Sequence, residues 1–474
     1  MPDAVVPLTG QSVRGAVWTL ANRLGVVART PGELVGALTA LARPSVVVLP
    51  DLDAAHDPAA ITELVHALRD LGHIRLVTGS EGGTGDGGTG DGGTEDAAPD
   101  DPGPDDAGPD DPGPDDAGPD DAGPDVAGPV DLADPGAVCA ADPSRVTAAY
   151  EHAADDPGDP DGPSGHGGLR TAWFRAGQSL IRDQSAAERA LVLLTALGDD
   201  ADPRLRPALN ALGTDAPWQV DWTRVRGDVT PPWPGPVAAL AQGTGRWSDH
   251  LLVADQRGTI RSLRPADATP APGTAAMPVR ITALAPLPDG TLVMLDERGR
   301  LHTHGDTALT EAVAATLRKH PGTALAATHR LVLVGDRHGS LHAFGYDGVH
   351  QAAAHRGRVT AVAVVDGPAP LVCSGGLDGT VRLWTPGGPP KHAPLAERDC
   401  PVTALAGRGP ELAVAWADGL VELRRLDTDE ALPFRPGPPV RAVAMPGDRS
   451  VVIGTDETLI RLTARPTTTP RCTR

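Results

Sequence analysis

The chain has 474 residues and a net charge of −21, from 62 acidic and 41 basic residues. This length exceeds a single ordinary hydrophobic core and predicts two to four domains. With more acidic than basic residues, the chain lacks the basic surface that a nucleic-acid-binding protein needs. No apolar run approaches the roughly 18–20 residues of a membrane-spanning helix. Sixteen of the acids lie in Glu81–Asp125, so the rest of the chain carries only −5.

Targeting and redox signals are weak. The N-terminus lacks a basic stretch followed by an apolar run, so it does not read as a signal peptide. Four scattered cysteines, with no CxxC pair, predict reduced thiols rather than a disulfide framework. We therefore expect a cytoplasmic protein. The chain has only two lysines, Lys319 and Lys391, which is typical of a GC-rich genome and suggests an actinobacterial source.

Residues 1–80 alternate helix-like and strand-like segments. Apolar residues recur at helical spacing in Pro31–Leu41 and again in Ala59–Leu71. Short apolar runs at Val46–Leu49 and Ile74–Val77 predict two strands. This order, with short connections, favours a parallel α/β unit.

Residues 81–129 are a low-complexity acidic segment. Gly-, Pro- and Asp-rich units repeat every five residues with almost nothing apolar to bury, which predicts disorder. The Gly-Gly-Thr-Gly-Asp units lack the nine-residue period and the apolar anchor of calcium-binding β-rolls, so we expect no calcium site. The pattern of residues 130–230 predicts a helical region, in which Ala186–Leu197 is the clearest helix.

Residues 231–466 contain a repeat of about forty residues. Each unit carries a tight turn with an acidic residue, and these aspartates are spaced by 41, 40, 42, 40 and 38 residues. Most turns follow a small-residue strand signal such as Val359-Thr-Ala-Val-Ala, which suits an inner strand. A period near forty with several strands per unit predicts β-propeller blades, followed by a disordered tail at 467–474. The turn residues are Asp255 and Gly258, Asp296 and Gly299, Asp336 and Gly339, Asp378 and Gly379, Asp418 and Gly419, and Asp456.

The clearest unit runs from Val359 to Trp384, and its end, Leu371–Trp384, reads as a β-hairpin with an Asp-Gly turn. This unit resembles a WD40 blade, with Asp378 in the turn and Trp384 at the end of the third strand. The resemblance covers about 236–465 and implies a multidomain protein with an all-β, WD40-like propeller. Six blades are visible, and a seventh is open in Trp218–Thr230 or around Thr307–His320. We expect the turn residues and Trp384 to be structural.

The N-terminal region resembles a STAND-type NTPase, the class that actinobacteria fuse to WD40 propellers. Val46–Pro58 resembles a Walker B strand, and Ile74–Ser80 resembles the sensor strand that follows it. Two acidic positions of the Walker B pattern hold Pro50 and Ala54 instead. Asp51 and Asp53 are left as weak candidates for cofactor binding.

The phosphate-binding half of that family's site is missing. No Gly-x-x-x-x-Gly-Lys-Ser/Thr stretch occurs, and no lysine precedes Lys319. The resemblance thus implies a partial α/β, P-loop-NTPase-like domain without its P-loop, followed by a helical region. In the family the P-loop precedes the equivalent of Ser12, so it would lie upstream of the given start.

These features favour a non-catalytic scaffold that binds an unidentified protein partner through its propeller, with the α/β part as a docking or regulatory domain. We expect no cofactor, metal or nucleic acid. His302 and His304 lie in a His-x-His pattern without a third ligand, so these and the pair His350 and His355 are expected at the surface. A nucleotide-dependent signalling or defence switch of the STAND type is the alternative. A sensor that binds a small ligand in the propeller channel is a third reading.

Overall fold

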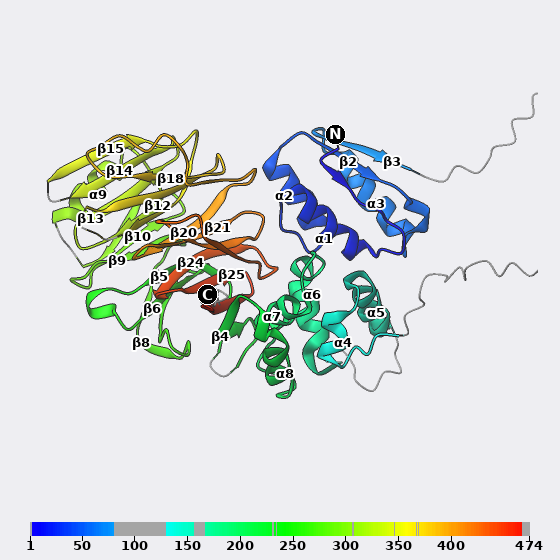
Figure 1. Ribbon diagram of the computed structural model, residues 1–474. Helices are drawn as coiled ribbons and strands as arrows, with labels where there is room; N and C mark the ends of the chain where they lie inside the picture. The colour runs from blue at the N-terminus through cyan, green and yellow to red at the C-terminus, as the bar shows by residue number, and fades with distance from the viewer. Residues whose placement is uncertain are drawn as a thin grey trace, which may run out of the picture.

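The computed structural model describes residues 2–79, 129–155, 166–229, 232–233, 235–305, 308–345, 347–365, 367 and 369–466. An α/β part, a helical part and a β-propeller follow one another along the chain (Figure 1). The two segments predicted as disordered, 81–129 and 467–474, lie outside the described residues apart from Pro129.

The N-terminal part is built on a small parallel sheet. Its strands β1 (Ala4–Val5), β2 (Ser45–Leu49) and β3 (Ile74–Thr78) lie in that order, and each neighbouring pair is parallel. The predicted parallel arrangement is therefore confirmed. Each helix begins at a side-chain cap that satisfies a free backbone N–H. These helices are α1 (Val13–Leu24), α2 (Pro31–Leu41) and α3 (Pro58–Arg69), capped by Ser12, Thr30 and Asp57.

Five helices form the middle part of the described chain. They are α4 (Pro135–Ala140), α5 (Pro143–Asp155), α6 (Leu169–Leu180), α7 (Ala186–Ala196) and α8 (Leu205–Leu212). Helix α7 starts with a capping box, in which Ser185 and Glu188 each bond the other's backbone N–H. Helices α6 and α7 carry the largest buried faces, which makes them the centre of this part.

The propeller has six blades in the described chain. Blade 1 is β5 (Val237–Gln242), β6 (Leu251–Asp255), β7 (Thr259–Leu263) and β8 (Pro270–Ala276). Blade 2 is β9 (Ile281–Pro286), β10 (Leu292–Asp296) and β11 (Leu301–His304). Blade 3 is β12 (Gly322–Ala327), β13 (Leu331–Asp336), β14 (Ser340–Gly345) and β15 (Gly348–Ala353).

Blade 4 contains the hairpin expected from the sequence, since β17 pairs antiparallel with β18. Its strands are β16 (Val359–Val365), β17 (Leu371–Gly376), β18 (Thr380–Trp384) and β19 (Ala396–Glu397). Blade 5 is β20 (Val402–Arg408), β21 (Glu411–Trp416), β22 (Val421–Arg425) and β23 (Ala431–Phe434). Blade 6 is β24 (Val440–Gly447), β25 (Ser450–Thr455) and β26 (Thr458–Ala464), completed by an earlier strand, β4 (Trp218–Val225).

The ring is closed by a strand from before the first blade. Strand β4 pairs antiparallel with β26 along its whole length, so the propeller begins at Trp218 rather than at residue 231. The stretch Trp218–Thr230 is therefore the outer strand of blade 6, not a seventh blade. The other place left open for a seventh blade holds helix α9 (Ala308–Leu317), which packs beside β11 and β14. The prediction of six blades is confirmed.

Small residues let neighbouring blades approach each other. The valine that opens one inner strand packs on a glycine in the second strand of the preceding blade. A Cβ at Gly335 would lie 2.4 Å from Val359 Cγ1, and one at Gly375 would lie 2.4 Å from Val402 Cγ1. A side chain at either glycine would therefore push two blades apart.

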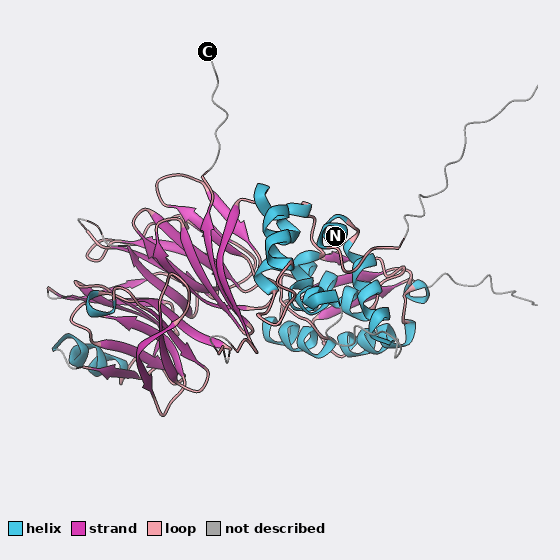
Figure 2. Ribbon diagram, turned by 90° about the horizontal axis from the view of Figure 1, so that it is seen from below, coloured by secondary structure: helices cyan, strands magenta, loops and turns pink. Residues whose placement is uncertain are grey.

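The three parts share one hydrophobic core, which runs from the N-terminal sheet through the helices into blades 5 and 6. Trp18 of α1 is fully buried against α6, where a Cβ at Gly177 would come within 2.0 Å of its ring. Figure 2 shows most of the helices gathered on one side of the propeller strands. The N-terminal and helical parts are thus fixed to the propeller by packing.

Candidate functional site

The turn aspartates of blades 1 to 3 share one arrangement. Asp255, Asp296 and Asp336 each end the second strand of a blade and are 7%, 5% and 3% exposed. One carboxylate oxygen of each accepts the backbone N–H groups two and four residues later, at 2.8–2.9 Å. The other oxygen binds the side chain six residues later, and these partners are Arg261, His302 and His342. Both oxygens of each carboxylate are therefore bonded within its own blade, where they stabilise the turn.

Blades 4 and 5 place the carboxylate elsewhere. Asp378 and Asp418 come one residue before the turn glycine, whereas the first three aspartates come three residues before it. The register is kept by the glycines, which are spaced by 41, 40, 40 and 40 residues. All five adopt φ between 72° and 91°, which glycine reaches without strain. The series of turn aspartates predicted as equivalent therefore mixes two positions. These glycines are Gly258, Gly299, Gly339, Gly379 and Gly419.

His355 is the centre of a buried network in blade 4. Its Nδ1 lies 3.0 Å from Asp378 Oδ1, and its Nε2 lies 2.8 Å from the Ser374 hydroxyl. Burial lowers the pKa of His355, although Asp378 opposes this shift. The ring is therefore neutral at pH 7, with Nδ1–H donating to the carboxylate and Nε2 accepting from the hydroxyl. The expectation that His355 lies at the surface is wrong, because its side chain is 0% exposed.

Trp384, in the same blade, is also a packing residue. It is 1% exposed and donates its indole N–H to the Gly388 carbonyl at 2.8 Å. A buried tryptophan with its polar atom paired contributes to stability rather than to a reactive site.

Asp418 of blade 5 binds two arginines. It is almost buried, at 6% exposure, and contacts Arg398 Nη2 at 2.6 Å and Arg435 Nη2 at 2.8 Å. Burial alone would raise the pKa of Asp418, but Arg435 and Arg398 outweigh it and hold the pKa below its ordinary value. The ionised carboxylate thus joins the segment that precedes blade 5 to the end of that blade.

The two acidic residues in the turn of blade 6 bind residues outside that turn. The Thr455 hydroxyl accepts the N–H groups of the turn in place of an aspartate, at 3.1 and 2.7 Å. Asp456 pairs with Arg441 at the start of the blade. The next residue, Glu457, forms ion pairs with Arg29 and Arg175, which belong to the α/β and helical parts. The last turn therefore connects the propeller to both preceding parts.

The weak cofactor candidates Asp51 and Asp53 lie exposed after β2. Asp51 adopts φ 60° and accepts a hydrogen bond from the Thr9 hydroxyl at 3.2 Å. No group of three histidine, cysteine or acidic side chains in the described chain could hold a metal ion. Cofactor binding by this pair stays a prediction.

The described cysteines are buried and free. Burial raises the pKa of both Cys139 and Cys373 to about 12. Because the thiolate is the nucleophile, thiols held protonated in this way are poorly suited to covalent catalysis.

The propeller channel opens into a cavity of about 500 Å³ at one mouth. All six inner strands contribute residues from their middle and second halves to it, so the expectation that the small-residue segments are inner strands is confirmed. Most of the lining is small or apolar, including Ala241, Ala285 and Met445. His329 and Arg408 add polar groups at the rim.

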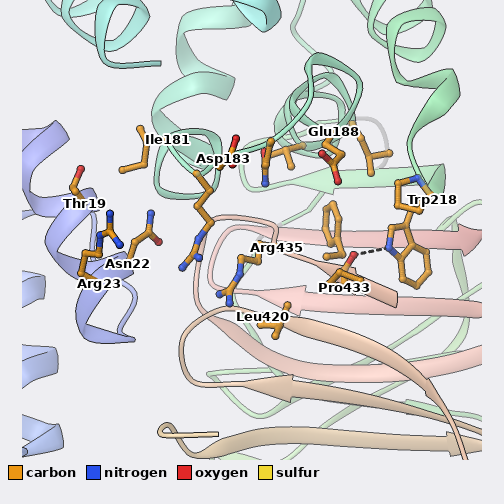
Figure 3. Close-up of a pocket in the computed structure, with 16 residues that line it drawn as sticks. Thr19, Asn22, Arg23, Ile181, Asp183, Glu188, Trp218, Leu420, Pro433 and Arg435 are labelled. Atoms are coloured by element: carbon orange, nitrogen blue, oxygen red, sulfur yellow. Dashed lines mark hydrogen bonds between the residues drawn. The ribbon is translucent and has the colours of Figure 1, made fainter. Parts of the chain in front are cut away.

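A second cavity of about 540 Å³ lies where α1, the α6–α7 loop and blade 5 meet. Figure 3 shows Asn22 and Arg23 on the α1 side, with Arg435 and Leu420 on the propeller side. No sequence motif indicated this cavity, because its lining comes from α1, the end of the helical part and blade 5, which are separated from one another by more than a hundred residues.

Comparisons with known proteins add little beyond the fold. No protein-family model and no curated protein matches the chain. Among solved structures, the computationally designed Ika8 protein is 20% identical over 49% of this chain and 72% of its own, with a TM-score of 0.33. The β-propeller domain of Myceliophteria thermophila Cps50 (Swd1) is 13% identical over 52% of this chain and 92% of its own, with a TM-score of 0.37.

These scores are too low to support an argument, so the propeller assignment rests on the strand pairing described above. No comparison supports the resemblance of the N-terminal region to a STAND NTPase. Within the described chain, no helix combines the length and apolar character needed to cross a membrane.

Proposed function

We propose that this chain is a non-catalytic scaffold that binds a protein partner through its WD40-like propeller. The turn carboxylates support this proposal because backbone N–H groups and neighbouring cationic or histidine side chains occupy them. The α/β and helical parts would then act as a docking or regulatory unit attached to blades 5 and 6.

The observation that carries the proposal is the different covering of the two propeller faces. On the turn side, Glu457 pairs with both preceding parts, and a Cβ at Gly437 would lie 2.7 Å from Ala176 of α6. The inner strands end on the opposite side, around the cavity of about 500 Å³. The described α/β and helical parts contribute no residue to this mouth, whereas they cover the turn side at blades 5 and 6.

The mouth has the character of a protein-binding surface. Its floor is small and apolar, while Pro288, His329 and Arg408 are exposed at its rim. Interfaces combine an apolar centre with a polar rim in this way. A loop or peptide that reached the floor would be held by contacts from several blades at once.

Capture of proteins on the immobilised full chain tests the proposal. The mouth variant His329→Glu with Arg408→Glu reverses or adds charge at the rim, where Arg408 makes only an exposed ion pair with Asp448. The matched control makes the same two changes on the turn side, at His338 and Arg298, which are also exposed. Proteins captured by the wild type and the control, and lost with the mouth variant, are the expected result.

Two outcomes would contradict the proposal at different levels. Capture of no protein above the level of the tag alone would refute the scaffold. Equal capture by the mouth variant would refute the mouth as the binding face. A separate assay of ATP binding and hydrolysis, with Asp53→Asn as the control, addresses the nucleotide switch, and turnover lost in that variant would favour it over the scaffold.

A further inference from the structure

Arginines from three parts of the chain gather around the cavity between α1 and blade 5. Arg23 lies in the last turn of α1, Arg182 lies in the loop after α6, and Arg435 follows β23. An adjoining cavity of about 340 Å³ shares these three residues and adds Arg398, which precedes β20. The two spaces meet at the cationic side chains.

One acid is buried within the cluster. The Asp418 side chain is 5% exposed, and its carboxylate is bonded to Arg398 and Arg435 and to the Leu420 N–H. A single carboxylate therefore faces two bound arginines, with Arg23 and Arg182 nearby.

The other acids that line the two cavities are occupied or exposed. Asp3 and Asp399 pair with Arg43. Glu188 accepts hydrogen bonds from Ser185 in the capping box of α7. Asp183 is exposed in the α6–α7 loop.

Two arginines are left without an acidic partner. Neither Arg23 nor Arg182 forms an ion pair with a carboxylate in the described part of the chain. Burial, together with the neighbouring Arg435, Arg398 and Arg23, lowers the pKa of Arg182 to about 10, and Asp418 opposes this shift. The side chain is thus half-buried among like charges, an arrangement that an anion would relieve.

Apolar side chains line the cavity beside these arginines. They are Phe434, Leu191, Leu420 and Trp218. The Trp218 indole donates to the Pro433 carbonyl at 2.9 Å, which fixes the orientation of the ring (Figure 3). A ligand in this cavity would contact both cationic and apolar side chains.

We propose that this cavity binds a small organic phosphate. The phosphate group contacts Arg23 and Arg182, whose planar guanidinium groups match its oxygens in paired hydrogen bonds, and Arg435 adds positive charge beside them. The apolar body of the ligand packs on Phe434 and Leu191. A volume of about 540 Å³ lies within the range of small-molecule sites. This site is separate from the channel mouth and does not depend on the scaffold function.

The test uses phenyl phosphate as the probe, with calorimetric titration and thermal unfolding of the full chain at constant ionic strength. The variants Arg182→Gln and Arg23→Gln each remove one unpaired cation. Arg298→Gln, an exposed arginine in the turn of blade 2, is the matched control. We expect saturable binding by the wild type and the control, and binding weaker by about tenfold or more in the two cavity variants.

Three comparisons keep the proposal falsifiable. Inorganic phosphate should bind more weakly than phenyl phosphate, and equal affinity would overturn the apolar half of the site. Benzoate should bind more weakly than phenyl phosphate, and equal affinity would overturn the preference for phosphate. Without ligand, Arg182→Gln should melt at or above the wild-type temperature, and a large decrease would show that Arg182 is bound within the protein. Unchanged binding by Arg182→Gln would refute the site.

Discussion

Replacing Asp418 by alanine tests whether a turn carboxylate holds its blade. The substitution removes an acceptor of three hydrogen bonds, from Arg398, Arg435 and the Leu420 N–H. It leaves the side chains of Arg435 and Arg398, which are only 15% and 35% exposed, without their acid. Breaking a buried ion pair on one side costs about 3–5 kcal/mol.

We expect Asp418→Ala to lower the stability of blade 5 by about 3 kcal/mol, near the lower end of this range, because water can reach Arg398 where it lies. Asp418→Asn keeps the shape and one acceptor, so it should fall between alanine and the wild type. Asp427→Ala is the matched control, since that exposed aspartate pairs with Arg425 at the surface and should leave stability unchanged.

Hydrogen exchange is the appropriate assay, because one melting temperature does not define a free energy for a chain with several parts. The amides of β21 and β22 should exchange roughly 100-fold faster in Asp418→Ala, since about 1.4 kcal/mol corresponds to a factor of ten. A change smaller than about tenfold in these strands would refute the reasoning. Equal acceleration in all six blades would instead show that Asp418 holds the ring as a whole.

Two further predictions concern burial. The pKa of His355 in the folded chain lies below its unfolded value of 6.5, so the unfolded state takes up the proton first as the pH decreases. The free energy of unfolding should therefore fall below about pH 6.5, by up to about 1.4 kcal/mol per pH unit. A urea titration series in which His355→Asn shows the same dependence between pH 6.5 and 5 would contradict this assignment. Gly177→Val should lower the free energy of unfolding by at least about 1–3 kcal/mol, because a Cβ at this position would overlap the Trp18 ring. Gly36→Val on α2, where no atom lies within 4 Å of a Cβ, is the control, and equal melting temperatures of the two variants would contradict the packing argument.

The repeat was predictable because each blade carries local signals. Leu371–Trp384 contains alternating apolar residues and an Asp-Gly turn, and its strands pair as expected. The turn position was harder to assign. Asp255 and Asp378 look equivalent in the sequence but lie three residues and one residue before the turn glycine, and only the left-handed glycines keep the register.

Features that depend on distant contacts were not predictable. Strand β4 pairs with β26, more than two hundred residues later, and no sequence feature of Trp218–Val225 identifies that partner. His355 was assigned to the surface because no sequence signal shows that Asp378 and Ser374 surround its ring. The arginine cavity was missed for the same reason, since α1 and blade 5 supply its opposite walls.

Hydrogen exchange on the complex with a captured partner tests the scaffold most directly. Binding at the channel mouth should slow exchange in the loops that follow the inner strands, at 243–250, 287–291, 328–330 and 409–410. The turn side, including Leu377, which is 57% exposed, should exchange as in the free chain. Protection confined to the turn side, or absent from the propeller, would contradict the account.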